Sequence, residues 1–96
     1  HSLGGALATL YAAWAEHRIA GLVTFGAPKV GTEVAVAEIT AADIRRYVMP
    51  MDFAPHWPPV PGLTHPAEAM RLAAPGWWPG PVSRHAVEGY VAGVSA

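Results

Sequence analysis

The sequence predicts an α/β fold in which parallel strands are covered by helices. The first observation behind this prediction is the order of the elements, because helical and extended patterns alternate along the chain. A helix between two strands implies parallel pairing, and a parallel sheet is normally covered on both faces. The second observation is size, since 96 residues make at most one small domain. Two predicted strands are too few for a sheet that is stable alone, so we expect an incomplete sheet.

The first predicted helix begins after Ser2. Its large apolar residues recur at helical spacing: Leu3, Leu7, Leu10 and Trp14. Almost every other position is small or apolar as well, so we expect this helix to be buried over most of its circumference.

Two short strands are predicted at residues 22–25 and 45–49. The first is a β-branched and aromatic run bounded by glycines, and the second ends before Pro50. Residues 32–42 lie between them and have a weaker helical pattern.

The second half of the chain is rich in turn-forming residues. Residues 50–62 hold five prolines, which argue against a helix or a central strand. Residues 66–73 are predicted to form a short helix. Ser83 is placed to cap a last helix that carries three valines on one face: Val87, Val91 and Val94.

The composition excludes several classes of protein. Six Lys and Arg against seven Asp and Glu give a net charge of −1, which does not provide the clustered basic face of a nucleic-acid binder. The absence of cysteine excludes a disulfide framework and a thiolate zinc site. No stretch reaches the roughly 20 apolar residues of a transmembrane helix. At 52% hydrophobic and 14% charged residues, the chain is too apolar to be disordered by composition.

Ser2 is the most informative residue of the sequence. A nucleophile elbow has the pattern G-x-S-x-G on a tight strand-to-helix turn, and its second half is present as Ser2-Leu3-Gly4. In such a turn the serine hydroxyl is exposed above the sheet, and the backbone N–H of Leu3 points at a developing oxyanion. The alternative is that Ser2 is an ordinary N-cap before a glycine-rich helix.

A serine nucleophile needs a base, and the base needs an orienting carboxylate. Asp52 follows the second predicted strand, at the end of the sheet where sites form in α/β proteins, whereas Asp43 precedes that strand. Among the histidines we favour His85, which follows Ser2 and Asp52 in the order used by α/β-hydrolases. His1 is expected to point away from Ser2.

Four motifs resemble those of the class 3 lipase family, an α/β-hydrolase group that acts on acylglycerols. They occur in the family order at residues 1–6, 24–31, 52–59 and 85–90. The third contains an Asp with Pro three residues later and paired prolines beyond, and the fourth contains a His with Tyr five residues later. The chain departs from the family pattern at Ala54, often Val, and at Met51, often Asn.

The resemblance implies that Ser2 is the nucleophile, that Asp52 orients the base and that His85 is the general base and later the acid. It implies hydrolysis of lipid esters through an acyl-enzyme, with a lipid–water interface as a partner and no cofactor. Residues 1–96 would then be the C-terminal part of an α/β-hydrolase domain that lacks N-terminal strands, a lid and the second oxyanion donor. Because one donor is worth about 100- to 1,000-fold in turnover, we expect this chain to be inactive or nearly so.

Three tryptophans lie in loops that flank the predicted site: Trp57, Trp77 and Trp78. Tryptophan suits lipid–water interfaces because one end of its side chain is polar. We therefore expect these residues to contact the substrate, and the alternative is that they pack against other strands.

Two other functions are compatible with parts of the pattern. A zinc site could draw on Asp52, His56, His65 and His85, although none of these residues has the spacing of a helical zinc motif. The chain could also be a non-catalytic scaffold with the same fold, or a lipid-binding module. The sequence does not decide between a secreted and a cytoplasmic location.

Overall fold

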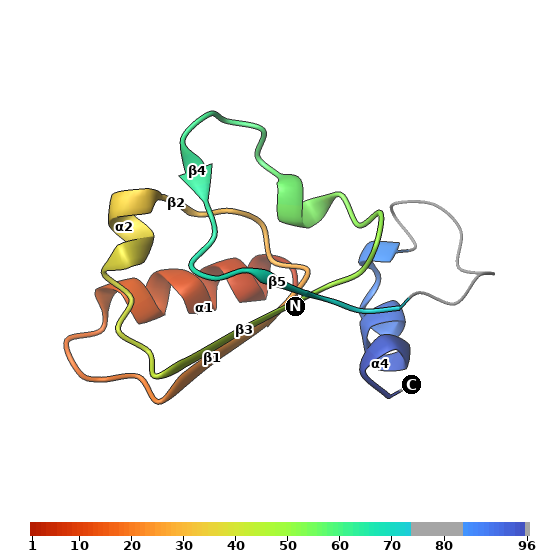
Figure 1. Ribbon diagram of the computed structural model, residues 1–96, viewed down its shortest axis with the longest axis horizontal. Coiled ribbons are helices and arrows are strands. Elements are labelled where there is room, and N and C mark those ends of the chain that lie inside the picture. The colour runs from red at the N-terminus through yellow and green to blue at the C-terminus, as the bar shows by residue number, and fades with distance from the viewer. Residues whose placement is uncertain (74–83, 96) are drawn as a thin grey trace.

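The computed structural model describes residues 1–73 and 84–95 (Figure 1). Helices and strands alternate in the first half of the chain, and short strands follow a proline-rich segment. The elements are α1 Leu3–Trp14, β1 Gly21–Phe25, β2 Gly31–Thr32, α2 Glu33–Ala37, β3 Asp43–Val48, the 3-10 helix η1 Ala54–His56, β4 Leu63–Thr64, β5 Ala69–Arg71 and α4 Val87–Ser95.

The main sheet has three strands in the order β1-β3-β5, and both pairs are parallel. The prediction of an α/β fold with parallel strands is therefore confirmed. The short helix expected over residues 66–73 is wrong, because β5 lies there and pairs with β3 from Arg46↔Ala69 to Val48↔Arg71. Pairing with β3 overrides the helix-forming side chains of this segment. A second, two-stranded antiparallel sheet joins β2 to β4.

Helix α1 packs against the sheet through its small residues. Its buried positions are Gly5, Ala6, Thr9 and Ala12. A Cβ added at Gly5 would lie 2.7 Å from the Cβ of Ala27 and 3.3 Å from that of Thr24, so the helix approaches β1 more closely than any larger residue allows.

The large apolar residues of α1 face outward, contrary to the expectation of a helix buried all round. Leu3, Leu7, Tyr11 and Trp14 are between 57% and 77% exposed. The helix itself was predicted correctly from the spacing of its large apolar residues. The stripe that is buried, however, is made of the small side chains, because these fit against the strands.

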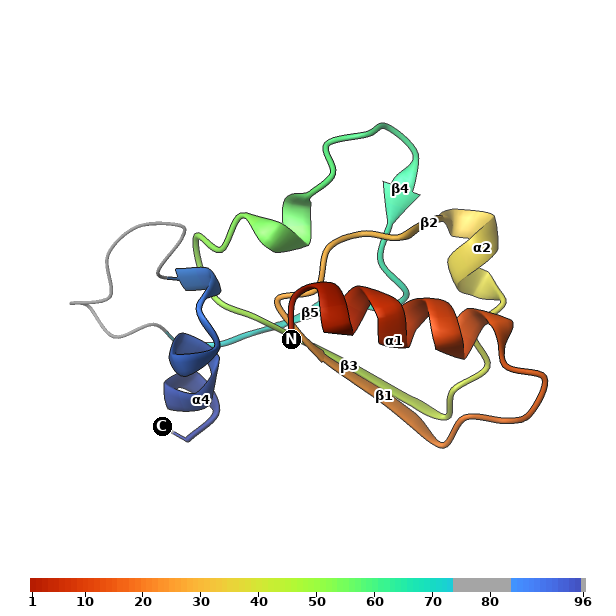
Figure 2. The same ribbon diagram turned by 180° about the vertical axis from the view of Figure 1, so that it is seen from behind.

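The two faces of the main sheet are covered unequally (Figures 1 and 2). The face that carries Leu22, Thr24 and Arg46 is buried, whereas Val23 and Met70 on the other face are 50% and 45% exposed. Helix α4 lies at the carboxyl end of that second face, where Tyr90 makes an edge contact with Phe25. Coverage of both faces was therefore a wrong expectation for the part of the chain that the structure describes.

The remaining elements are short. Helix α2 occupies the first part of the segment predicted as weakly helical, and Thr32 caps it by accepting from Ala35 N over 3.3 Å. Within the proline-rich segment 50–62, where no helix was expected, η1 forms a single 3-10 turn. The proposed cap at Ser83 lies outside the described residues. No helix among residues 1–73 and 84–95 has the length and apolar character to cross a membrane.

Candidate active site

Ser2 lies in a strained turn directly before α1. Its φ of 55° and ψ of −127° belong to a region that residues other than glycine avoid, at a cost of about 1–3 kcal/mol. Its backbone N–H donates to Phe25 O, at the carboxyl end of β1, over 3.0 Å. Its side chain makes no capping bond to α1, which argues against the ordinary N-cap interpretation.

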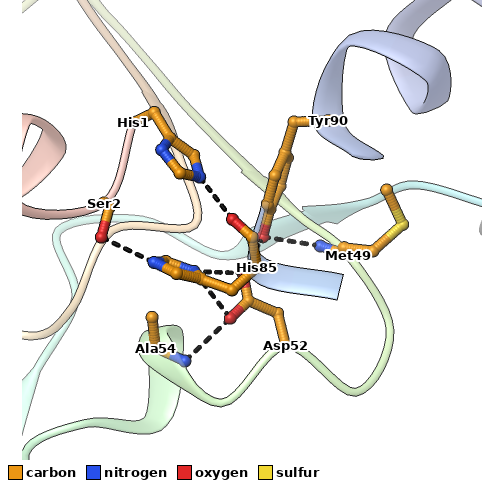
Figure 3. A network of polar contacts seen from close by, with 7 residues as sticks. All are labelled: His1, Ser2, Met49, Asp52, Ala54, His85 and Tyr90. Atoms are coloured by element: carbon orange, nitrogen blue, oxygen red, sulfur yellow. Dashed lines mark hydrogen bonds and ion pairs between the residues drawn. The ribbon is translucent and has the colours of Figure 1, made fainter. Parts of the chain in front are cut away.

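The structure brings Ser2, Asp52 and His85 together at the carboxyl ends of the parallel strands (Figure 3). Ser2 Oγ lies 2.6 Å from His85 Nε2, and His85 Nδ1 lies 2.9 Å and 3.0 Å from the two carboxylate oxygens of Asp52. A carboxylate accepts hydrogen bonds, so Nδ1 carries a proton. The Nε2 atom of the neutral ring is then the acceptor for the Ser2 hydroxyl.

Asp52 is held in a buried position by donors from three directions. It is 1% exposed, and its oxygens accept from His85 Nδ1, from Ala54 N over 2.9 Å and from the Tyr90 hydroxyl. Tyr90 in turn accepts from Met49 N over 3.0 Å. Burial and the hydrogen bond to Asp52 raise the pKa of Tyr90, so its hydroxyl keeps the proton that it donates. These bonds satisfy the buried carboxylate and fix its orientation.

Gly26 makes room for this arrangement. Its φ of +61° is unfavourable for residues with a side chain, and a Cβ there would lie 2.7 Å from Asp52 Oδ2 and 2.8 Å from the Tyr90 hydroxyl. The glycine after β1 therefore lets the Asp52–Tyr90 pair pass directly over the backbone. From the sequence, Gly26 was noted as a strand boundary and as part of the 24–31 motif, with no link to Asp52 or Tyr90.

The His1 ring, which was expected to point away from Ser2, lies against His85. His1 Nε2 donates to His85 O over 2.6 Å, and the centroids of the two rings are 4.9 Å apart. The His1 ring also contacts the edge of Tyr90. This contact was not predicted from the sequence, because the chain order of Ser2, Asp52 and His85 assigns no role to His1.

Leu3 is the first residue of α1, so its N–H is one of the helix donors that have no acceptor within the helix. This N–H follows Ser2 directly and stands at the positive end of the helix dipole. The role of this N–H as an oxyanion donor stays a prediction.

The predicted substrate residues are described only in part. The Trp57 side chain is 57% exposed, directly after η1, and is free to contact a ligand or a surface. Trp77 and Trp78 lie outside the described residues. An apolar cavity of about 160 Å³ adjoins His1, and its other lining residues are Phe25, Val87, Tyr90, Val91 and Val94.

The other histidines considered for a metal site do not join the Ser2 network. His65 Nε2 donates to Pro55 O over 2.6 Å, and of the four proposed zinc ligands only Asp52 and His85 are joined by a hydrogen bond. Among residues 1–73 and 84–95, no three His, Cys, Asp or Glu side chains gather in a way that could hold a metal ion.

Comparison with known proteins gives one finding at the level of a family. The family model described as lipase (class 3) matches residues 1–62. The matched span contains the strained turn at Ser2, both strands β1 and β3, and Asp52. A comparison with curated proteins found no match.

Proposed function

The chain belongs to the class 3 lipase family, and from this premise we propose that it hydrolyses carboxylic esters of lipids with Ser2 as the nucleophile. The observation that carries the proposal is the strained Ser2 turn with its hydroxyl 2.6 Å from His85 Nε2. A serine is a weak nucleophile until an adjacent base accepts its proton, and the contact supplies that base.

The proposed reaction has two stages. Ser2 Oγ attacks the ester carbonyl while His85 Nε2 takes the hydroxyl proton, and the Leu3 N–H donates to the oxyanion that forms. The protonated His85 then gives its proton to the leaving alcohol, and the acyl group remains on Ser2. Water attacks the acyl-enzyme with His85 again as the base, which releases the fatty acid and restores Ser2.

Asp52 has an orienting role in this scheme. Its two oxygens face His85 Nδ1, so they favour the ring tautomer that accepts from Ser2 and stabilise the imidazolium formed during attack. Bonds from Ala54 N and Tyr90 hold the carboxylate in place. The reaction requires no metal or cofactor, because the proton moves between Ser2, His85 and the substrate.

The proposed substrates are acylglycerols or related lipid esters. The family supports this class, and the apolar cavity beside His1 is suited to an apolar group. Exposed Trp57 supports contact with a lipid–water interface. Trp77 and Trp78 belong to the same proposal on the chemistry of their side chains.

Turnover by this chain is expected to be low. Among the described residues, the Leu3 N–H is the donor in position to bind an oxyanion, whereas α/β-hydrolases use a second N–H from another loop. A test of the nucleophile should therefore not depend on rapid turnover. Covalent labelling by a fluorophosphonate meets this condition, because it needs one attack by the activated serine.

The experiment is intact-mass analysis of the folded chain after incubation with a fluorophosphonate. We expect one phosphonyl group per chain, located on Ser2, and no addition to Ser2→Ala. Ser83→Ala and Ser95→Ala serve as controls that keep Ser2 and should be labelled like the parent chain. A folded parent chain that stays unlabelled would favour the non-catalytic scaffold over the hydrolase.

A further inference from the structure

A cavity of about 370 Å³, lined in part by polar side chains, lies apart from the apolar cavity beside His1. None of the residues of the Ser2–His85–Asp52 network lines it. It lies between the β3–β5 pair and the segments around η1 and β4. The charged and imidazole side chains that line it are Arg46, His56, His65, Glu68 and Arg71. Two guanidinium groups and two imidazoles therefore face one cavity with a single carboxylate, and the reaction proposed for Ser2 uses none of them.

Arg46 is the unusual member of this set, because it is a buried cation for which the described residues provide no anionic partner. It projects from β3 and is 6% exposed. Its Nη1 donates to the backbone carbonyl of Ala67, and no ion pair joins it to a carboxylate in the described part of the chain. Burying a charge without a counter-charge is unfavourable, and a guanidinium has five N–H donors to satisfy.

Burial and like charges dominate the electrostatic surroundings of Arg46. Burial, together with the nearby charge of Arg71, lowers the pKa of Arg46 to about 10. Burial, with the nearby Arg46, Lys29 and His56, lowers the pKa of His65. The two guanidinium groups therefore repel each other, and a bound anion would relieve that repulsion and favour the protonated form of His65.

The cationic groups approach the cavity from different elements. Arg46 belongs to β3, and Arg71 is an exposed residue of the neighbouring strand β5. His65 follows β4, and its Nε2 already donates to Pro55 O, so the neutral ring has no second N–H and gains one for a ligand only when it is protonated. His56 ends η1. Donors on several sides suit a tetrahedral oxyanion with three or four acceptor oxygens better than a planar carboxylate with two.

We propose that this cavity binds a phosphate group, with Arg46 and Arg71 as its principal ligands and His56 and His65 beside them. The proposal goes beyond ester hydrolysis at Ser2 and does not depend on it. Arginine forks match phosphate geometry and keep their charge at physiological pH. The exposed Arg71 and His56 leave the cavity accessible to a ligand from solution. Glu68 faces the same cavity and weakens binding by repelling the anion.

The test is calorimetric titration of the chain with inorganic phosphate at constant ionic strength. We expect saturable binding with a Kd of about 1 mM or tighter. Arg46→Gln should weaken it about tenfold or more, which is the range for one charge-assisted hydrogen bond. Arg71→Gln should weaken it severalfold and, because Arg71 is exposed, it tests the site even if Arg46→Gln does not fold.

The matched control is Arg45→Gln. Arg45 is adjacent to Arg46 and carries the same charge, but it is exposed and pairs with Asp43 over 2.9 Å. The Arg45→Gln variant should bind phosphate like the parent chain, whereas the Glu68→Gln variant should bind phosphate more tightly. The proposal is overturned by the absence of saturable binding, or by equal weakening in Arg45→Gln and Arg71→Gln, which would show only a general effect of net charge.

A second arm distinguishes free phosphate from a lipid headgroup. Phosphatidylcholine vesicles with and without phosphatidic acid are pelleted with the parent chain and with Arg71→Gln. Recruitment that requires both phosphatidic acid and Arg71 assigns the site to a phosphomonoester headgroup. Phosphate binding without such recruitment assigns it to a soluble ligand, and the absence of both overturns the proposal.

Discussion

Asp52 and Arg46 are both buried charged side chains near the carboxyl end of β3, but their surroundings differ. Asp52 is 1% exposed and receives bonds from an imidazole, a phenol and a backbone N–H. Arg46 is 6% exposed and has a backbone carbonyl as its hydrogen-bond partner. Burial alone therefore does not reveal the role of a charged side chain. Asp52 is held in position by several donors, whereas Arg46 is hydrogen-bonded but forms no ion pair with a carboxylate among the described residues, so its charge can still attract an anionic ligand.

The substitution of Asp52 is expected to change the reactivity of Ser2 more than any other proposed substitution. We expect Asp52→Asn to slow fluorophosphonate labelling of Ser2 about 10⁴-fold, as loss of the orienting carboxylate does in serine proteases. The amide keeps the shape of the side chain but no longer favours a proton on His85 Nδ1. The labelling rate is measured by intact mass against time.

The control for this substitution is Asp43→Asn, which removes the other aspartate of the chain. Asp43 is exposed, begins β3 and pairs with Arg45. Its rate should equal that of the parent chain. Equal rates for Asp43→Asn and Asp52→Asn would contradict the orienting role of Asp52.

A smaller effect is expected when the partners of Asp52 remain but are displaced. In Gly26→Ala, the new Cβ overlaps Asp52 Oδ2 and the Tyr90 hydroxyl, and the φ of +61° adds backbone strain. A shift of about 1 Å in such a network reduces the rate about 100-fold, so labelling of Ser2 should slow by that order and the melting temperature should fall.

Gly4→Ala is the matched control, because a Cβ at Gly4 meets no atom within 4 Å. Alanine is also the better helix former, so this variant should melt at the parent temperature or above it. The interpretation of Gly26 fails if both glycine variants melt alike and Gly26→Ala is labelled at the parent rate.

The smallest change is expected in the pH dependence of stability, through His65, which lines the same cavity as Arg46. The pKa of His65 is lowered in the folded chain by burial and by the positive groups around it, Arg46, Lys29 and His56. The unfolded chain therefore binds the proton more readily, and stability is lost as the pH falls from about 6.5 through the folded pKa. Thermal unfolding between pH 7.5 and 5 should show this decline.

His65→Gln should flatten the pH dependence, whereas exposed His17→Gln should leave it unchanged. Because Glu68 also lines the cavity, the profile is repeated in Glu68→Gln to remove its titration. A decline that persists undiminished in His65→Gln would assign it to other groups.

Much of the fold and the meeting of Ser2, Asp52 and His85 could be predicted from the sequence. Both predicted strands exist as β1 and β3. Asp52 follows the carboxyl end of β3 and contacts His85, as the order Ser2, Asp52, His85 predicted. The strands follow from local sequence patterns. The position of Asp52 follows from the rule that sites in α/β proteins form at the carboxyl ends of parallel strands.

The features that were missed depend on contacts between distant segments. Strand β5 consists of residues that favour a helix, and its conformation comes from pairing with β3. The buried stripe of α1 was chosen by fit against Ala27 and Thr24 rather than by hydrophobicity. The Arg46 cavity assembles from four separate segments, and no local spacing connects them.

The backbone at Ser2 also has a consequence for how this sequence can change over time. A left-handed φ of 55° is a conformation in which glycine is at ease and serine is not. Replacement of this serine by glycine would relax the turn and remove the hydroxyl, so selection for stability alone would favour glycine at this position. Stability and the presence of a hydroxyl are therefore opposed at a single residue of the chain.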